Sequence, residues 1–293
     1  MFFSTLLPIL ATIAAVSAVG IPARREEESN LVLTPGGHAD PANVLQVPDG
    51  AHISRVGENF HVAHPDGSLF AKVPISTTAS SKVLPESSGW VTYASWVNSD
   101  TSTPITKFTT NFVVPPAPKS YTGQTVFLFP GLMPETGTSI LQPVLQYGPS
   151  AAGGGEYWAV ASWYVPDDGA YFVTSLVKVS AGQSLEGIMS LGSFNVAENT
   201  YSYSSSMSPM SQTLNVDLNL QLNWASITLE SYNLNSASAY PAGTTEFSNV
   251  YIELSTGQSP TTSWSLVQDT ADEVTTAMEV NSMAGNGVAV ITY

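Results

Sequence analysis

Short β-rich runs separated by turn residues follow one another from Trp90 to Tyr293, and this pattern constrains the fold more than any other feature. Val, Ile, Thr and aromatic residues fill the runs, and Gly, Pro, Asn and Asp stand between them. A helical period is almost absent, and no strand–helix–strand spacing occurs. The pattern predicts an all-β fold, a two-sheet antiparallel β-sandwich of the jelly-roll, concanavalin-like type. The expected strands span 89–97, 106–114, 124–132, 139–147, 156–165, 170–179, 184–192, 212–222, 225–233, 246–254, 262–267 and 287–293.

The N-terminal end is an apolar run that stops at Val16-Ser17-Ala18, a small-x-small cleavage pattern. This is typical of a secretory signal peptide, which we place at 1–18. A membrane anchor is the alternative, but the run is short and no stop-transfer charge cluster follows it. No later window is apolar enough to span a bilayer. We therefore expect a secreted, extracellular protein without a membrane partner, and a monomer.

Residues 19–80, which we call the leader, differ in composition from the rest of the chain. The dibasic pair Arg24-Arg25 precedes three glutamates, and the alternation over 50–73 predicts a small hairpin with Asp66-Gly67 in its turn. A Ser/Thr-rich linker follows. We interpret the leader as a pro-segment and 81–293 as the functional domain. The alternatives are that the leader is a flexible tail or that its hairpin is a permanent part of the domain.

The charge of the chain restricts its partners. The formal net charge is −15, and beyond the leader the basic residues are Lys82, Lys107, Lys119 and Lys178. Such a surface repels nucleic acid and anionic membranes. The leader carries all 4 histidines. We expect it to dock on the acidic domain near neutral pH and to be released near pH ~4, where the carboxylates become protonated.

The missing residue types narrow the chemistry of 81–293. The chain has 0 cysteines, and its histidines lie in the leader. If the leader is removed, Ser-His-Asp and Cys-His nucleophiles and a His-ligated zinc site are excluded. No Asp-x-Asp-x-Asp-Gly calcium loop occurs. The run Gly153–Gly155 lacks the Lys-Ser/Thr of a phosphate loop and predicts a turn or flap. We expect no metal and no cofactor. Carboxylate acid–base chemistry remains, which favours hydrolysis of a glycoside or a peptide.

A candidate site lies in the stretch 139–166. Gln142 and Gln146 are four positions apart, so an extended strand turns both toward one face. The next run offers more aromatic area than one strand needs for a core. Because Trp158 and Trp163 are an odd number of positions apart, they point to opposite faces, and one of them packs in the core. The expected substrate-binding residues are Trp90, Trp158, Trp163, Tyr164 and Gln146.

Several segments together resemble the fungal glutamic peptidases, the eqolisin family. Each motif is weak alone, but their order and spacing over about 88–254 match the family. The matching segments are SGWVTYASW (88–96), FTTNFVVPPAP (108–118), SILQ (139–142), ASWYVP (161–166), KVSAGQSLEGIMS (178–190), ASITLESY (225–232) and YPAGTTEFSNV (240–250).

The resemblance implies a catalytic pair, Gln142 and Glu230. Glu230 would take a proton from an attacking water while the Gln142 amide donates to the developing oxyanion. On β alternation, Ile227 and Leu229 share one face of their strand, and Thr228 and Glu230 the other.

This sequence also departs from the family pattern. FLFPGLMPE (127–135) replaces the family's WVGIDG, Ser162 stands where the family has Glu between tryptophans, and Gly182-Gln183 replaces Gly-Asp.

Two functions follow from these features. The first is a secreted acid endopeptidase that hydrolyses polypeptides with a Gln/Glu pair and an activated water. The alternative is a catalytically inactive, lectin-like β-sandwich that binds cell-wall material or another polysaccharide, because such sandwiches are common among lectins.

Overall fold

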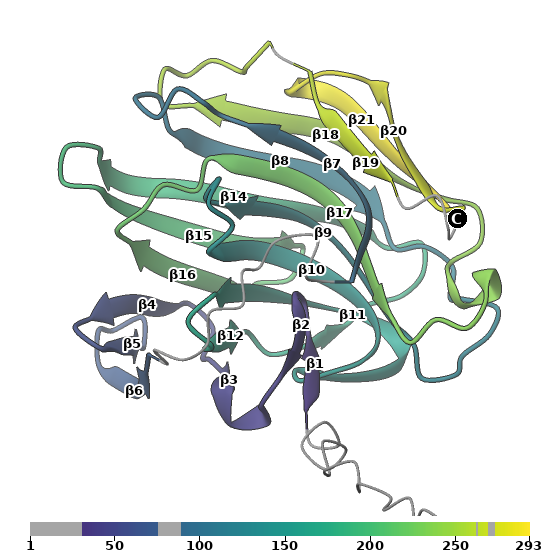
Figure 1. The fold of residues 1–293 in the computed structure, drawn as a ribbon, viewed down its shortest axis with the longest axis horizontal. Helices are drawn as coiled ribbons and strands as arrows, with labels where there is room; N and C mark the ends of the chain where they lie inside the picture. Colours follow the sequence, from purple (N-terminus) through teal and green to yellow (C-terminus); the bar gives the residue numbers. More distant parts are fainter. Residues whose placement is uncertain (1–30, 76–88, 262, 269–272) are drawn as a thin grey trace, which may run out of the picture. The chain divides into compact units, whose positions relative to one another are not determined.

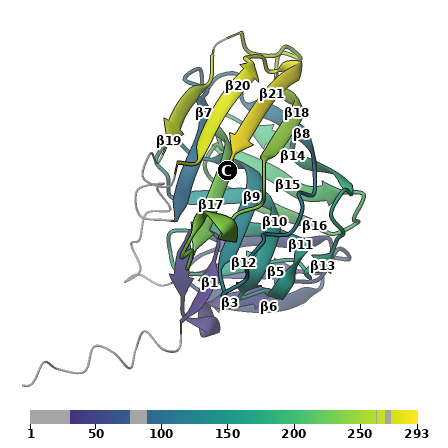
Figure 2. The same ribbon diagram turned by 90° about the vertical axis from the view of Figure 1, so that its right-hand side faces the viewer.

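The computed structural model describes residues 31–75, 89–261, 263–268 and 273–293. Two large sheets contain nearly all the strands of this part of the chain (Figures 1 and 2). This confirms the predicted all-β sandwich. The described residues include two short 3₁₀ turns, Pro41–Asn43 and Ala237–Ala239. No helix in these ranges is long and apolar enough to cross a membrane. The predicted signal peptide lies outside the described residues.

The first sheet has nine strands. Their order is β19 (Ser265–Gln268), β7 (Trp90–Val97), β17 (Trp224–Tyr232), β9 (Thr125–Met133), β10 (Ser139–Ser150), β11 (Gly153–Pro166), β12 (Tyr171–Val173) and β3 (Val44–Gln46), and β13 (Val177–Lys178) pairs with β11.

The second sheet has ten strands. Their order is β20 (Thr275–Val280), β21 (Ala284–Thr292), β18 (Thr244–Leu254), β8 (Ile105–Val113), β14 (Ser184–Asn195), β15 (Thr200–Ser208), β16 (Thr213–Leu218), β4 (Ala51–Val56), β5 (Asn59–Ala63) and β6 (Leu69–Pro74). A separate hairpin consists of β1 (Val32–Thr34) and β2 (Gly37–Ala39).

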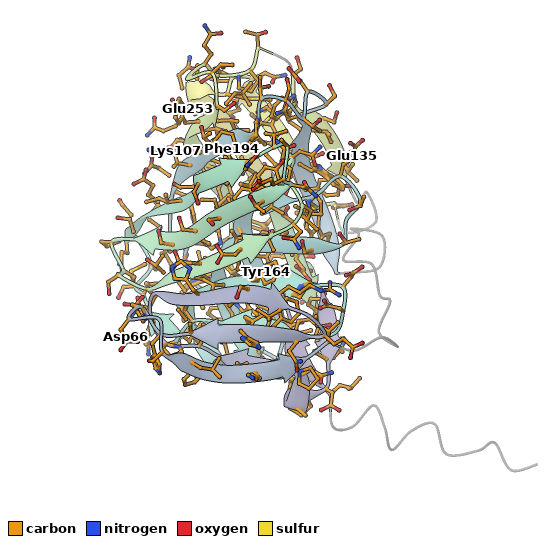
Figure 3. All side chains as sticks on the ribbon, turned by 90° about the vertical axis from the view of Figure 1, so that its left-hand side faces the viewer. Asp66, Lys107, Glu135, Tyr164, Phe194 and Glu253 are labelled. Carbon is orange, nitrogen blue, oxygen red and sulfur yellow. The ribbon has the colours of Figure 1, made fainter. Side chains whose placement is uncertain are left out.

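The leader extends both sheets. β3 pairs with β12 and β4 pairs with β16, and both pairings are parallel, whereas the other strand pairs are antiparallel. The predicted hairpin is a three-stranded meander, β4–β5–β6, whose second turn contains Asp66 and Gly67. In Figure 3 these strands continue the ten-stranded sheet at its lower end.

The nine-stranded sheet is buried on both faces. Its inner face packs against the ten-stranded sheet through residues such as Leu128, Leu132 and Leu145. Its outer face carries a second apolar cluster, which includes Phe127, Phe129 and Trp163 and extends to Leu33 of β1. Accordingly, all nine residues of β9 are buried. We call this second surface the outer face.

The three consecutive glycines do not form the predicted turn or flap. Gly153, Gly154 and Gly155 open β11 and pair with the end of β10, and the turn is Ala151-Ala152. A β-carbon on Gly154 would lie 2.3 Å from the carbonyl oxygen of Gly148 and 2.4 Å from Nε2 of Gln146. Gly154 is therefore required by a close approach inside the hairpin.

Candidate functional site

Glu230 lies near the end of β17 and points to the outer face. The inner-face positions Ile227 and Leu229 belong to the core between the sheets, which confirms the predicted alternation. The Glu230 side chain has 0% exposure. A fully buried carboxyl group is costly unless it is neutral or hydrogen-bonded, so its partners define the chemistry of the site.

Two donors hold one oxygen of this carboxyl. The Tyr232 hydroxyl donates to Oε1 of Glu230 at 2.5 Å, and the Gly36 backbone N–H donates to the same atom at 2.7 Å. Oε2 has no hydrogen-bond partner in the part of the chain that the structure describes. Oε1 therefore accepts two hydrogen bonds, whereas Oε2 accepts none from the described residues.

Burial changes the protonation of Glu230. Loss of water around the carboxyl raises the pKa of Glu230 to about 7, although Tyr232, Gly36 and the Trp90 side chain each lower it. The pKa of Tyr232 is raised far above its ordinary value, first by burial and then by the adjacent Glu230. In this structure Glu230 is therefore protonated in an acidic medium, and Tyr232 is a phenol, not a phenolate.

The hairpin β1–β2 covers this carboxyl. Gly36 sits in its turn with φ 99° and turns its N–H toward Glu230. Leu33 packs into the outer-face cluster, and its carbonyl accepts a hydrogen bond of 2.7 Å from Ala151 N. The His38 ring meets the Tyr232 ring edge-on at 5.8 Å. A peptide segment of the leader therefore already lies at the candidate site.

The register of the sheet separates Gln142 from Glu230. Leu141 pairs with Leu132, which places Gln142 beside Gly131, and Gly131 pairs with Ser226 on β17. Glu230 lies four residues further along β17, roughly 13 Å at about 3.3 Å per residue. The two side chains share the outer face but not the same row across the strands.

Gln146 lies in the row of Glu230. On β9, Phe127 pairs with both residues, so its side chain stands between them. The Gln146 amide is fully engaged: Nε2 donates to Gly148 O at 2.7 Å and to Gly153 O at 2.9 Å, and Oε1 accepts from Ser150 Oγ at 2.8 Å. These contacts fix the end of the β10–β11 hairpin.

Gln142 and Trp163 form an unsatisfied pair beside this row. They are cross-strand neighbours on β10 and β11. Gln142 is 1% exposed and Trp163 0%. Oε1 of Gln142 and Nε1 of Trp163 have no hydrogen-bond partner among the described residues. An acceptor and a donor are thus held side by side in an apolar surrounding, where unpaired polar groups are uncommon.

The other predicted substrate-binding residues divide between the faces. Trp90 packs on the outer-face cluster and lies 5.7 Å from the Phe129 ring. Trp158 and Tyr164 belong to the core between the sheets, away from Glu230. Tyr164 is labelled in Figure 3. The predicted split of Trp158 and Trp163 between opposite faces is confirmed. Ser162 faces inward, where it accepts from Ser205 Oγ at 3.2 Å.

Sequence reasoning missed two contributors to the site, Tyr232 and Gly36. The signal for Tyr232 was the Glu-x-Tyr spacing, which places both side chains on one face of a strand. No local pattern indicated Gly36, because its contact with Glu230 spans 194 positions. The described residues contain no group of three acidic, His or Cys side chains that could hold a metal ion.

Comparison with known proteins gives similarity at the level of structure. No family model matches the sequence, and the search of curated proteins finds no similar protein. The chain is similar to scytalidoglutamic peptidase bound to a peptide-based transition-state analogue, with 16% identity and a TM-score of 0.47, over 70% of this chain and 98% of that chain.

Two further solved structures show the same likeness. One is SCP-B, a member of the eqolisin family in complex with the tripeptide Ala-Ile-His, with 16% identity and a TM-score of 0.44 over 70% of this chain and 98% of that chain. The other is aspergilloglutamic peptidase from Aspergillus niger, with 16% identity and a TM-score of 0.36 over 58% of this chain and 98% of that chain. The resemblance predicted from the sequence is confirmed in this comparison, which at such identity bears on the fold alone.

Proposed function

We propose that this protein is a secreted acid endopeptidase in which Glu230 is the acid–base group. The observation that carries the proposal is the 2.7 Å hydrogen bond from the Gly36 backbone N–H to Oε1 of the buried Glu230. A backbone N–H of a peptide segment is bound at the carboxyl group that would perform the chemistry. The outer face thus accepts a polypeptide at Glu230, as a peptide substrate requires.

The unpaired side-chain atoms of Gln142 and Trp163, which lie beside the row of Glu230, support a polypeptide ligand. A peptide group offers one N–H donor and one C=O acceptor. Oε1 of Gln142 can accept such an N–H, and Nε1 of Trp163 can donate to such a carbonyl. The role of Gln142 as the donor to the oxyanion stays a prediction from the sequence resemblance, because the register sets it four residues from the row of Glu230.

The chemistry requires the hairpin to leave Glu230. Water then reaches the carboxyl, the effect of burial decreases, and the pKa of Glu230 falls toward its ordinary value. The free Oε2 takes a proton from a water molecule as the water oxygen attacks the peptide carbonyl carbon. The same oxygen returns the proton to the amide nitrogen as the C–N bond breaks, and Glu230 ends in its starting state.

The alternative, an inactive binding module, is favoured by one observation. Of the two glutamines on the outer face, the one in the row of Glu230 has its amide occupied by the β10–β11 hairpin. A protein that binds a polysaccharide without cleaving any peptide at acid pH would support this alternative.

The test uses the full chain and a denatured protein substrate at acid pH, with new termini identified by mass spectrometry. We expect cleavage by the wild type and a loss of roughly 10²–10⁴-fold in Glu230→Gln, the range that acid–base groups contribute. Glu253→Gln is the matched control, because Glu253 also accepts from a tyrosine two residues away but is not fully buried. We also expect Gln142→Ala to abolish cleavage. Unchanged cleavage in Glu230→Gln contradicts the proposal.

A further inference from the structure

Tyr232 contacts Glu230 from a fixed direction. Both residues lie on β17, two positions apart, so their side chains leave the same face of the strand. The Tyr232 hydroxyl reaches back along the strand and donates to Oε1 of Glu230 at 2.5 Å. The same hydroxyl accepts the Gly89 backbone N–H at 2.9 Å. The phenol is thus held from both sides.

The start of β7 holds the Tyr232 ring. Ser231 N donates to Gly89 O at 2.9 Å, which fastens this segment to β17. A β-carbon on Gly89 would lie 2.7 Å from Cζ of Tyr232 and 2.6 Å from Ser231 O. Glycine is therefore needed here, because any side chain would push the ring away from Glu230.

These contacts do not depend on the leader. Gly89 and Phe127, whose ring meets that of Tyr232 edge-on at 6.3 Å, both belong to the sandwich. Of the two donors to Oε1, Gly36 belongs to the leader hairpin and Tyr232 to the sheet. When the hairpin leaves, Tyr232 is the donor to Oε1 that remains, and the Trp90 side chain of β7 also stays beside the carboxyl.

We propose that Tyr232 is a positioning residue that holds Oε1 of Glu230 in place and thereby makes Oε2 the atom that exchanges the proton with the substrate. The proposal rests on the proposed hydrolysis at Glu230. Tyr232 acts through Glu230 and touches no reacting atom. A carboxyl group held at one oxygen keeps a single orientation, which is what proton transfer to a bound water requires.

The groups around Glu230 determine in which direction its pKa should shift when the Tyr232 hydroxyl is removed. Tyr232 faces it from β17, His38 from β2 packs on Tyr232, and Tyr171 from β12 acts electrostatically on Tyr232. Burial raises the pKa of Glu230, and the hydrogen bond from Tyr232 is the strongest of the contacts that lower it. Loss of the hydroxyl should therefore raise this pKa further.

The experiment follows the protonated carboxyl of Glu230 in the full chain by infrared spectroscopy across pH, with the signal assigned by its absence in Glu230→Gln. In the wild type the midpoint should lie at about 7. In Tyr232→Phe we expect it to rise by about one pH unit, the equivalent of one hydrogen bond to a charged group. Tyr251→Phe is the matched control, because Tyr251 donates to Glu253 at 2.5 Å on another strand; it should leave the midpoint unchanged.

A second variant keeps the hydroxyl and so preserves the packing if Tyr232→Phe does not fold. With 3-fluorotyrosine at position 232 the phenol is more acidic and donates more strongly, so the midpoint should fall. A midpoint that is unchanged in this variant, or that does not rise in a folded Tyr232→Phe protein, overturns the inference.

Activity separates this inference from the proposed function. In an active protein, Tyr232→Phe should lower kcat with little change in KM, and the pH profile should shift with the titration midpoint. A protein that cleaves no peptide but shows both midpoint shifts contradicts the proposed function. The same result supports the positioning of Glu230 by Tyr232. An active protein whose midpoints are unchanged supports the proposed function and contradicts the positioning role of Tyr232.

Discussion

Among the described residues, Glu230 and Glu253 each accept a hydrogen bond from a tyrosine two residues away. The Tyr232–Glu230 and Tyr251–Glu253 oxygen pairs are both 2.5 Å apart. Glu230 is completely buried, whereas Glu253 is not. Burial is the largest effect on the pKa of Glu230. At the scale of one residue, the position on the outer face, more than the tyrosine contact, makes Glu230 chemically distinct.

The two outer-face glutamines should differ in their effect on stability. Gln146→Leu removes three hydrogen bonds at the end of the β10–β11 hairpin, so we expect a loss of about 2–4 kcal/mol in the free energy of unfolding. Gln142→Leu removes an unpaired buried oxygen and should change it by less than about 1 kcal/mol. Urea denaturation measures both. An equal loss in the two variants would contradict the assignment of Gln146 to the hairpin.

Alternation predicted which face each candidate residue occupies, but not which residues lie side by side. The faces of Glu230, Trp158 and Trp163 follow from a period of two along one strand. The row across the strands depends on the register between β10, β9 and β17, which tertiary packing sets. For that reason the sequence selected Gln142 on its motif, whereas the structure places Gln146 in the row of Glu230.

At the scale of elements, the strands rich in β-branched and aromatic residues were predictable. β7, β8, β9 and β17 lie within one or two residues of the expected ranges. β15 was missed because serine is not a strand former, although its buried residues Tyr201, Tyr203, Ser205 and Met207 alternate regularly. β20 was missed as well, and 170–179 splits into β12 and β13.

The hairpin β1–β2 is the element that controls access to Glu230 in the proposed function. It touches the sandwich mainly through Leu33, Gly36 and His38. A short two-stranded hairpin has little stability of its own, so its position on the sandwich depends on these contacts.

Leu33→Ala should therefore loosen the hairpin and raise the rate of peptide cleavage. A buried Leu→Ala change costs about 2–5 kcal/mol, so the open form should become at least 10-fold more populated. Leu33 is 8% exposed, whereas its neighbour Leu31 is 40% exposed. Leu31→Ala is therefore the control and should leave the rate unchanged. A lower or equal rate in Leu33→Ala argues against closure by the hairpin.

At the scale of the whole molecule, the leader is part of the sheets. Ile53, Phe60 and Val62 are buried in the core between the sheets. Arg55 lies 3.7 Å from Asp168, and His52 lies 4.0 Å from Asp217. The hairpin β1–β2 could leave Glu230 while β3 to β6 stay in place, because they pair with different strands. Release of the leader as a whole stays a prediction.

The pH dependence of stability should reflect the buried carboxyl groups. The pKa of Glu230 is raised to about 7 and that of Asp168 to about 6, in both cases mainly by burial. A raised carboxyl pKa means that the folded state binds more protons than the unfolded state between the two pKa values. The free energy of unfolding is then highest below pH about 4.5 and decreases as the pH rises to about 7.

Glu230→Gln should remove part of this decrease, because glutamine resembles the protonated glutamate at every pH. For Glu230 alone we expect the decrease between pH 4.5 and 7 to be roughly 3 kcal/mol, from 1.36 kcal/mol per pH unit. Urea denaturation at several pH values should therefore show a shallower pH dependence in Glu230→Gln than in the wild type. Self-repulsion of the acidic chain also weakens the fold as the pH rises, but it affects both proteins similarly. Equal slopes in Glu230→Gln and the wild type would show that Glu230 is not protonated in the folded protein.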